Sequence, residues 1–471
     1  MIVISKFINF IKGWWSKMFD YNKIANDFDI DVETSKTVLD AVQKWADIFN
    51  GKEPWVNDQV MSIHVAKSIC ETVAKAVTIE YKSKCSDENI DKIYQKFLKR
   101  IRTNTEYGIA KSYIFFKPYY SNGTIKISVV QADKCIPFKF SNDGDLLGMI
   151  TVDQIQDGNK VYTRLEYNEL IDNTMQIKNV AYEGEVNGSI LNKKIDLKKV
   201  DKWKDIDEVA SIGGIDRLIG GFFTMPNANT LDNSSPLGQS IFHNAIGTLE
   251  QIDKQISRAI WEFEGSELAI DVDESMLEHD KTGKVKYPTG KKRLFRGLSF
   301  DEMKDKNYNV FSPQIRDTSL FNGLNELLRQ AETECQIAFG TISKNTNIAK
   351  TATEIKNSKQ DYYVTVSDIQ TAMEYALNDL VYGIYVLCRL YGIPVDTDYS
   401  MSHDWDDSIL VDKETKRNQA LIERNNKLTD DVQYFMETMD MNEEDAIEYV
   451  RNIRERRKLF EDPVESEEDE E

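Results

Sequence analysis

The sequence of 471 residues contains little cysteine and little histidine. Its five cysteines are odd in number and widely scattered, and the chain has no Cys-x-x-Cys pair or His-Cys cluster. This pattern argues against a disulfide framework and a zinc site, and it favours folding in a reducing cytoplasm. The four histidines lie far apart, so no Ser–His–Asp or Cys–His arrangement can be argued from their order.

Residues 1–19 lack the features of a secretory or membrane-spanning segment. They contain neither an uninterrupted apolar run nor a small-residue cleavage site. They are also too few and too charged to cross a bilayer. Isoleucine, phenylalanine and tryptophan share one helical face, so we expect an amphipathic helix that docks on a neighbouring domain or subunit. Attachment to a membrane surface is the alternative.

Acidic residues outnumber basic ones, which gives a formal net charge of −20. Such a charge argues against a protein that grips nucleic acid over its whole surface. The charge does not exclude a protein through which DNA slides. A tunnel with an acidic lining repels phosphates, whereas each lysine–phosphate contact would add affinity by releasing counterions. Solubility alone is the alternative explanation. Residues 461–471 are almost entirely acidic and are expected to be disordered.

The first half of the chain predicts helices followed by an antiparallel sheet. Apolar spacing is mainly helical between Phe28 and Arg102 and changes to a period of two from Ser112. Turn-forming Asn, Asp and Gly residues, such as Asn122-Gly123, separate the alternating segments. The predicted strands are 112–120, 124–130, 136–141, 146–155, 160–170 and 175–184. The predicted fold class is therefore α+β and rich in helix.

Three long amphipathic helices are predicted in the second half of the chain. The first runs from Pro236, which follows the capping residue Ser235, to Phe263, and spans roughly 42 Å. The second runs from about Thr318 to Phe339. The third begins at the capping box Thr351-x-x-Glu354 and continues to Tyr391. Residues 412–459 are predicted to form further helices, one of them capped by Asn442.

A strand-rich basic segment, residues 267–312, separates the first two of these helices. It contains seven basic side chains and no acidic one between positions 281 and 296: Lys281, Lys284, Lys286, Lys291, Lys292, Arg293 and Arg296. These charges favour a surface that binds an anionic partner, and the alternative is a hairpin whose basic side chains only face solvent. A phosphate-binding loop is excluded, because six residues separate Gly283 from Gly290 where the motif has four, and Lys292 replaces the required Ser or Thr.

Five stretches of the chain, in this order, resemble the portal proteins of tailed phages, of the type found in phages of Gram-positive hosts. The resemblance covers most of the chain. The stretches that carry it are 129–150, 233–270, 319–343, 351–363 and 404–423.

The resemblance implies a portal-type subunit with an α/β wing, a two-helix stem, a small strand-containing clip, a long helix after a tunnel loop and a helical crown. Its expected divisions are an N-terminal helix (1–19), the wing (20–232), the first stem helix (233–266), the clip (267–312), the second stem helix (313–340), the tunnel loop (341–350), the long wing helix and return strand (351–411), the crown (412–460) and an acidic tail (461–471).

The resemblance also implies a function without catalysis or a cofactor. Twelve copies would form a ring at one capsid vertex, through which double-stranded DNA passes during packaging and ejection. The expected partners are the terminase motor, the major capsid and scaffolding proteins, and the head-completion or connector proteins, with no stable membrane partner. Assembly would take place in the host cytoplasm, and the mature location would be the virion.

The resemblance assigns roles to two sets of residues. In the tunnel loop, Ser343, Lys344, Asn345, Thr346, Asn347 and Lys350 would contact DNA phosphates without reading bases. In the clip, the seven basic residues would form a ring that touches DNA phosphates or an acidic partner. Without such roles, the loop would be an ordinary surface connection and the clip residues would lie on a solvated hairpin.

Two other classes of protein remain open. A membrane-associated scaffold would use the helix of residues 1–19. A metal-dependent DNA-processing enzyme would use the carboxylates of Asp404, Asp406 and Asp407 beside His403. Neighbouring residues on a strand or turn point in different directions, which argues against the metal site.

Overall fold

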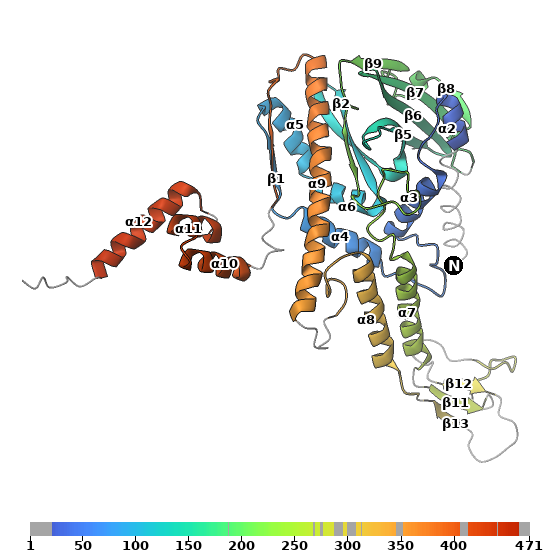
Figure 1. Cartoon of the computed structure of the whole chain (residues 1–471). Helices are drawn as coiled ribbons and strands as arrows, with labels where there is room; N and C mark the ends of the chain where they lie inside the picture. The colour runs from blue at the N-terminus through green and yellow to red at the C-terminus, as the bar shows by residue number, and fades with distance from the viewer. Residues whose placement is uncertain are drawn as a thin grey trace, which may run out of the picture. The chain divides into compact units, whose positions relative to one another are not determined.

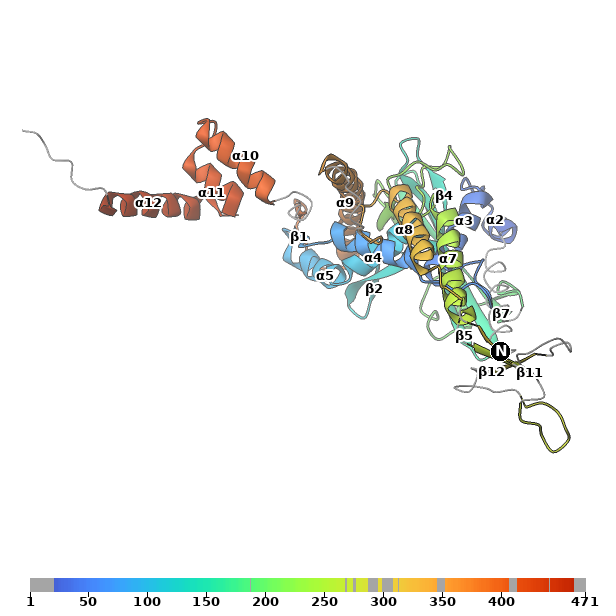
Figure 2. The ribbon, with the colours of Figure 1, turned by 90° about the horizontal axis from the view of Figure 1, so that it is seen from below.

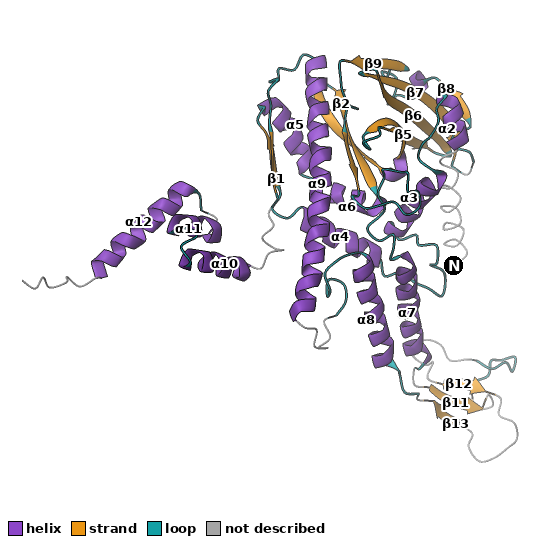
Figure 3. Ribbon diagram, viewed as in Figure 1, coloured by secondary structure: helices purple, strands orange, loops and turns teal. Residues whose placement is uncertain are grey.

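The computed structural model describes residues 21–186, 188–266, 269–273, 277–286, 295–298, 308–311, 313–344, 352–405, 413–439 and 441–460. The chain divides into two compact units (Figure 1). The larger unit comprises Met1–Thr78 and Lys82–His403, and the smaller comprises Ile79–Tyr81 and Asp404–Glu471. Figure 3 shows the mixture of helix and strand, which confirms the predicted α+β class.

Five helices begin the described chain, and three of the longer ones bury an apolar face. They are α2 (Tyr21–Phe28), α3 (Lys36–Phe49), α4 (Val65–Val77), α5 (Glu88–Leu98) and α6 (Ile101–Lys111). Asp87 caps α5 by accepting a 2.8 Å bond from the Ile90 N–H. The sequence analysis missed a short strand within this region, β1 (Lys82–Cys85), which pairs with β14 (Met401–Asp404).

The largest sheet is antiparallel, in the order β4-β5-β6-β7-β8, with β9 also paired to β7. Its strands are β4 (Cys135–Phe140), β5 (Leu146–Asp157), β6 (Lys160–Ile171), β7 (Thr174–Glu185), β8 (Lys193–Ile195) and β9 (Val209–Gly213). One face packs its alternate residues, such as Leu165 and Tyr167, against Ile24 and Phe28 of α2. The opposite face carries a smaller apolar cluster around the fully buried Trp203.

A second sheet has the order β10-β2-β3, formed by β2 (Tyr113–Ser121), β3 (Thr124–Gln131) and β10 (Gly221–Thr224). The long helix α9 (Ala352–Leu390) lies across it. A Cβ at Gly221 would stand 2.0 Å from the carbonyl oxygen of Ala376, so this close approach of helix to strand requires glycine. The six strands predicted from residues 112–184 are confirmed as β2–β7.

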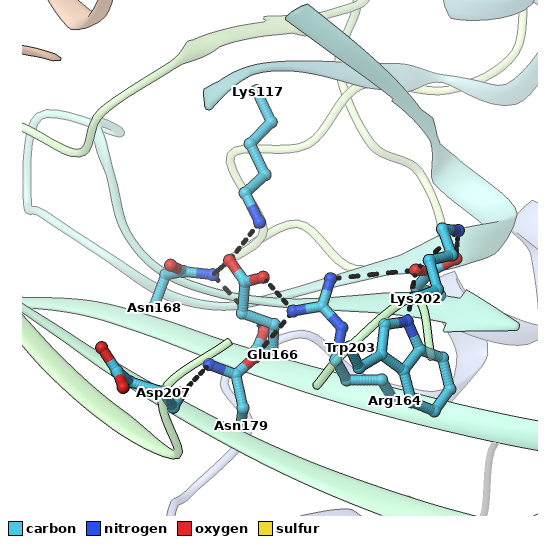
Figure 4. Close-up of polar contacts among 9 residues, drawn as sticks. Lys117, Arg164, Glu166, Asn168, Asn179, Lys202, Trp203 and Asp207 are labelled. Carbon is cyan, nitrogen blue, oxygen red and sulfur yellow. Dashed lines mark hydrogen bonds and ion pairs between the residues drawn. The ribbon is translucent and has the colours of Figure 1, made fainter. Parts of the chain in front are cut away.

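A buried ionic network connects the two sheets (Figure 4). Glu166 on β6 pairs with Lys117 on β2, and its second oxygen accepts a 2.7 Å bond from Arg164. Burial alone would raise the pKa of Glu166, but Lys117 and Arg164 outweigh it and lower that pKa to about 2. Arg164 also donates to Asn179 at 2.8 Å, while Asp153 accepts from the indole N–H of Trp203 at 2.9 Å. The network fixes the sheets to each other.

The first long helix begins ten residues later than predicted. Helix α7 spans Ile246–Gly265, and residues 236–245 are irregular. Their backbone N–H groups bond to other segments, as when Gly238 donates to the Thr224 hydroxyl at 3.0 Å and Ile241 donates to the Ile109 carbonyl at 3.1 Å. The prediction that the helix starts at Pro236 was wrong, because tertiary hydrogen bonds replace the helical ones there while burying the apolar residues.

The second and third long helices match their predictions more closely. Helix α8 spans Asp317–Glu334 and ends earlier than Phe339, because Gln336 adopts a left-handed φ of 55°. Helix α9 begins at Ala352, directly after the predicted capping residue Thr351. Between α7 and α8, strands β11 (Ala269–Asp273), β12 (Phe295–Leu298) and β13 (Tyr308–Phe311) form a sheet in the order β12-β11-β13. The basic segment therefore contains strands, as predicted.

The smaller unit contains three helices, α10 (Lys413–Asn425), α11 (Asp431–Met439) and α12 (Glu443–Phe460). Asn442 caps α12 by accepting a 2.8 Å bond from the Asp445 N–H, as predicted. Asp431 at the start of α11 accepts from Arg424 at 2.8 Å, and Phe435 packs edge-on against Tyr449. These contacts hold the three helices together.

Candidate functional site

Helices α7 and α8 form an antiparallel pair that is embedded in the larger unit at one end only. The two helices lie side by side in Figures 1 and 2, and the Gln255 side chain donates to the Leu320 carbonyl at 3.2 Å. Near the other end, Arg316 pairs with both carboxylate oxygens of Glu262, at 3.0 and 2.8 Å. This bidentate pair fixes how the two helices align where the body no longer supports them.

The far half of this pair exposes large apolar side chains. Trp261 is 69% exposed, and Ile260, Phe263 and Phe321 are exposed as well. The rings of Phe263 and Phe321 contact each other, with centroids 6.0 Å apart, but leave their outer surfaces uncovered. We call Ile260, Trp261, Phe263 and Phe321 the stem patch. Exposed large apolar side chains of this kind are typical of surfaces that contact another chain.

The embedded half of α7 is tied to the segment between α3 and α4 by Asp253. This buried carboxylate accepts from the indole N–H of Trp55 at 2.8 Å and from the backbone N–H of Ile63 at 3.0 Å. One helical turn further on, Ser257 accepts from the backbone N–H of Met61 at 3.0 Å. Burial raises the pKa of Asp253. Residues 55–63 are thereby held along α7 and set its direction.

The segment that follows α8 is held at its base by two side chains of that helix. The fully buried carboxylate of Glu332 accepts four bonds of 2.7–3.1 Å, from the N–H groups of Gly340, Ile342 and Ser343 and from the Ser343 hydroxyl. Two turns earlier, Asn325 accepts from the Lys344 N–H at 2.7 Å and donates to the Lys344 carbonyl at 3.2 Å. We call Glu332 and Asn325 the loop clamp.

The loop clamp corrects the position predicted for Ser343. Ser343 was predicted at the tip of the tunnel loop, whereas the structure buries it at the base of the segment, against Glu332. Lys344 is exposed directly after the clamp. The remaining predicted loop residues, Asn345, Thr346, Asn347 and Lys350, lie outside the described residues. The sequence did not predict the loop clamp, because a glutamate on an amphipathic helix normally faces solvent.

Three of the seven predicted basic residues lie on a described turn. Asp280 closes it by accepting from the N–H groups of Thr282 and Lys284 at 2.7 and 3.0 Å, and a β-bridge joins His279 to Val285. Lys281, Lys284 and Lys286 are exposed on this turn. The backbone of Arg296 belongs to β12, although its side chain lies outside the described residues, as do Lys291, Lys292 and Arg293 in full.

Two of the histidines, His243 and His403, have structural roles. His243 accepts from the indole N–H of Trp45 at 3.1 Å, and burial lowers its pKa. His403 contacts the hydroxyl of Ser83 at 3.1 Å and the side chain of Asn378 at 3.0 Å. Asp406 and Asp407 lie outside the described residues. Within the ranges that the structure describes, no three His, Cys, Asp or Glu side chains are grouped so that they could hold a metal ion.

Comparisons with known proteins identify the class of this chain. Residues 72–451 match the family described as "Phage portal protein, SPP1 Gp6-like". The chain belongs to this family. It is a structural protein of a phage-type virion rather than an enzyme: a self-associating subunit at a capsid vertex that connects head and tail.

One solved structure is similar to the chain over much of its length. It is titled "Neck of native GTA particle computed with C12 symmetry", with 9% sequence identity and a TM-score of 0.41. The similarity covers 84% of this chain and 92% of that one. A search of curated proteins found no match. Among the described helices, none is both long and apolar enough to cross a membrane.

Proposed function

We propose that this chain forms the DNA channel of the portal vertex as a ring of twelve copies. The stem patch is the observation that carries the proposal. Within the described chain, α7 and α8 pack against each other, yet their far half exposes Trp261 and three other apolar side chains. In a family that self-associates, a neighbouring copy is the partner that would cover them.

The loop clamp supports a role in the channel for the residues that follow it. It fixes the backbone of residues 340–344 on α8, so the exposed side chain of Lys344 and the segment beyond it are left to reach toward DNA. We assign the DNA contacts to Lys344, Asn345, Thr346, Asn347 and Lys350, and we assign Ser343 to the anchor. Two lysines per copy suit a transient contact, because affinity for DNA grows with the number of phosphates neutralised.

The basic segment between the stem helices serves, in this proposal, as the clip that docks the terminase motor and then the connector proteins. The exposure of Lys281, Lys284 and Lys286 supports this role, since their charges face solvent on a well-defined turn. The divisions into wing, stem, clip, tunnel loop and crown follow the ranges given above, with the first stem helix shortened to Ile246–Gly265. Assembly would take place in the host cytoplasm.

Negative-stain electron microscopy of the purified full-length protein tests the ring. We expect rings with a central hole, and their rotational symmetry gives the number of copies directly. A matched pair of variants tests the surface: Trp261→Ser should abolish rings, whereas Glu264→Gln, a change at an exposed neighbour, should leave them intact. Compact monomers of the unmodified protein at high concentration would refute the proposal.

A further inference from the structure

The free edge of strand β3 borders a groove that the channel function does not use. The groove lies between β3 and the helices α5 and α6, and its volume is about 580 Å³. Its apolar lining includes Ile93 and Phe97 from α5 and Ile125, Ile127 and Val129 from β3. It lies wholly within the larger unit.

The backbone of β3 is paired on one side only. The register places Ser121 opposite Thr124 across the two-residue turn Asn122-Gly123, where the flanking residues form a hydrogen-bonded pair. By alternation, Ile125, Ile127 and Val129 direct their N–H and C=O groups away from β2. Within the described residues, no second strand pairs with that edge. Proteins generally cover or charge such an edge, because it can accept another strand.

A buried donor in the groove also lacks an acceptor. The side-chain nitrogen of Asn104 on α6 has no hydrogen-bond partner among the described residues, although the residue is only 3% exposed. An unmade hydrogen bond at a buried amide costs about 1–3 kcal/mol. A carbonyl or carboxylate oxygen entering the groove would satisfy it.

The charged side chains of the groove all carry the same sign. Lys96, Arg100 and Lys126 line it, and no acidic residue does. None of the three forms an ion pair with a carboxylate in the part of the chain that the structure describes. In a chain with a net charge of −20, this uncompensated cluster favours an acidic occupant.

We propose that the β3 groove binds an extended acidic segment of a second protein, which adds as a further strand antiparallel or parallel to β3. Its backbone would bond to the outward groups of Ile125, Ile127 and Val129. Alternate apolar side chains would fill the groove beside Phe97, with an acidic end near Lys96, while the acidic side chains between them would lie on the other face of the sheet, beside Lys126. Strand addition at a sheet edge combines backbone affinity with side-chain specificity in this way. This inference does not depend on the DNA channel.

A peptide probe tests the proposal on the full-length protein. We would use a fluorescein-labelled peptide of about nine residues that alternates valine and glutamate, enough to span the roughly 27 Å of β3. Fluorescence anisotropy should show saturable binding. The same peptide with every backbone amide N-methylated cannot donate to β3 in either strand direction and should bind at least about tenfold more weakly. Equal binding of the two peptides would reduce the interaction to charge attraction and overturn the proposal.

Two substitutions at Ile127 distinguish the contribution of its backbone N–H to binding from that of its side chain. Ile127→Pro removes an N–H that points away from β2, so the β2–β3 ladder stays intact while the added strand is blocked. Ile127→Ala keeps that N–H. We expect the proline variant to lose binding and the alanine variant to keep most of it. If Ile127→Pro does not fold, Lys96→Glu combined with Lys126→Glu replaces it, and undiminished binding by that variant would overturn the proposal.

Hydrogen–deuterium exchange distinguishes a foreign segment from a second copy of this chain. In the free full-length protein, the backbone amides of residues 124–131 that face the edge should exchange rapidly, and the valine–glutamate peptide should slow them. Protection of these amides already in the free protein, at a level that rises with protein concentration, would show that another copy covers the edge. That result would overturn the proposal while leaving the channel function untouched.

Discussion

Glu332 receives both the backbone N–H and the side-chain hydroxyl of Ser343, at 2.8 Å each, in a site where its carboxylate has no exposure to solvent. A buried carboxylate is stable only when hydrogen bonds replace its hydration. Four donors do so here, and all come from the segment just after α8. The charge of Glu332 therefore serves to hold one end of a loop in a fixed position.

Glu332→Gln should loosen the base of the loop. An amide has one acceptor oxygen, so at least one of the four donors loses its partner, at a cost of about 2 kcal/mol. Trypsin cleaves after exposed lysines, and Lys344 directly follows the clamp. If cleavage follows the population of the open loop, the rate at Lys344 should rise about 30-fold. Glu326→Gln, a change on an exposed turn of the same helix, is the control and should leave the rate unchanged.

The pair formed by Lys117 and Glu166 predicts a dependence of stability on pH. The folded-state pKa of Glu166, about 2, lies below its ordinary value of 4.5. Its contribution is therefore complete above pH 4.5 and is lost as the pH falls toward 2. Glu166→Gln should destabilise the protein by roughly 3 kcal/mol at pH 7 and flatten the acid limb of a plot of melting temperature against pH.

The exposed pair of Lys160 and Glu183 supplies the control for that experiment. Its lysine is 57% exposed and its carboxylate 32% exposed, so solvent screens the interaction. Glu183→Gln should leave both the melting temperature at pH 7 and the acid limb nearly unchanged. Equal effects of the two substitutions would show that the Glu166 network adds nothing beyond a surface ion pair.

Asp253→Ala should detach residues 55–63 from α7. The substitution leaves the indole N–H of Trp55 and the backbone N–H of Ile63 without their acceptor, which costs about 1–3 kcal/mol for each group that stays buried. We expect a lower melting temperature together with a red shift of Trp55 fluorescence as water reaches the ring. Glu250→Ala, one turn away on the partly exposed side of α7, should cause neither change.

Sequence patterns predicted the helices and strands that are determined by residues close together in the sequence. The β2–β7 strands were recovered almost in full, because alternation and turn residues such as Asn122-Gly123 act over a few positions. The helix predicted from Pro236 failed because its first ten residues bond to Thr224 and Ile109, which are distant in sequence. The turn at Asp172-Asn173 lies in the predicted break between strands 160–170 and 175–184, but its two residues, with left-handed φ values of 47° and 59°, were not named as turn formers.

In the candidate site, too, features of contiguous residues were predicted, and features that depend on distant contacts were not. The stem helices and the basic segment could be recognised from periodicity and charge, since both are properties of contiguous residues. The loop clamp could not, because Glu332 and Asn325 are polar residues on a helix whose burial depends on where the next segment folds. The β3 groove was equally hidden, since it requires α5, α6 and β3 to be placed in space.

The two groups of basic residues in the segment between α7 and α8, the proposed clip, allow a test of where partners dock. Lys291, Lys292 and Arg293, all replaced by alanine, should impair DNA packaging or connector docking while rings still form, because these residues carry charge without belonging to the stem patch. A second triple variant, Lys281→Ala with Lys284→Ala and Lys286→Ala, removes the same charge from the described turn, which Asp280 keeps folded through backbone bonds. Negative-stain images would count rings, and a pull-down with the terminase or connector protein would measure docking.

A defect in both triples would indicate a general electrostatic surface, whereas a defect in one alone would locate the contact. Loss of rings in either would show that those residues are structural, and the docking role proposed for them would be wrong.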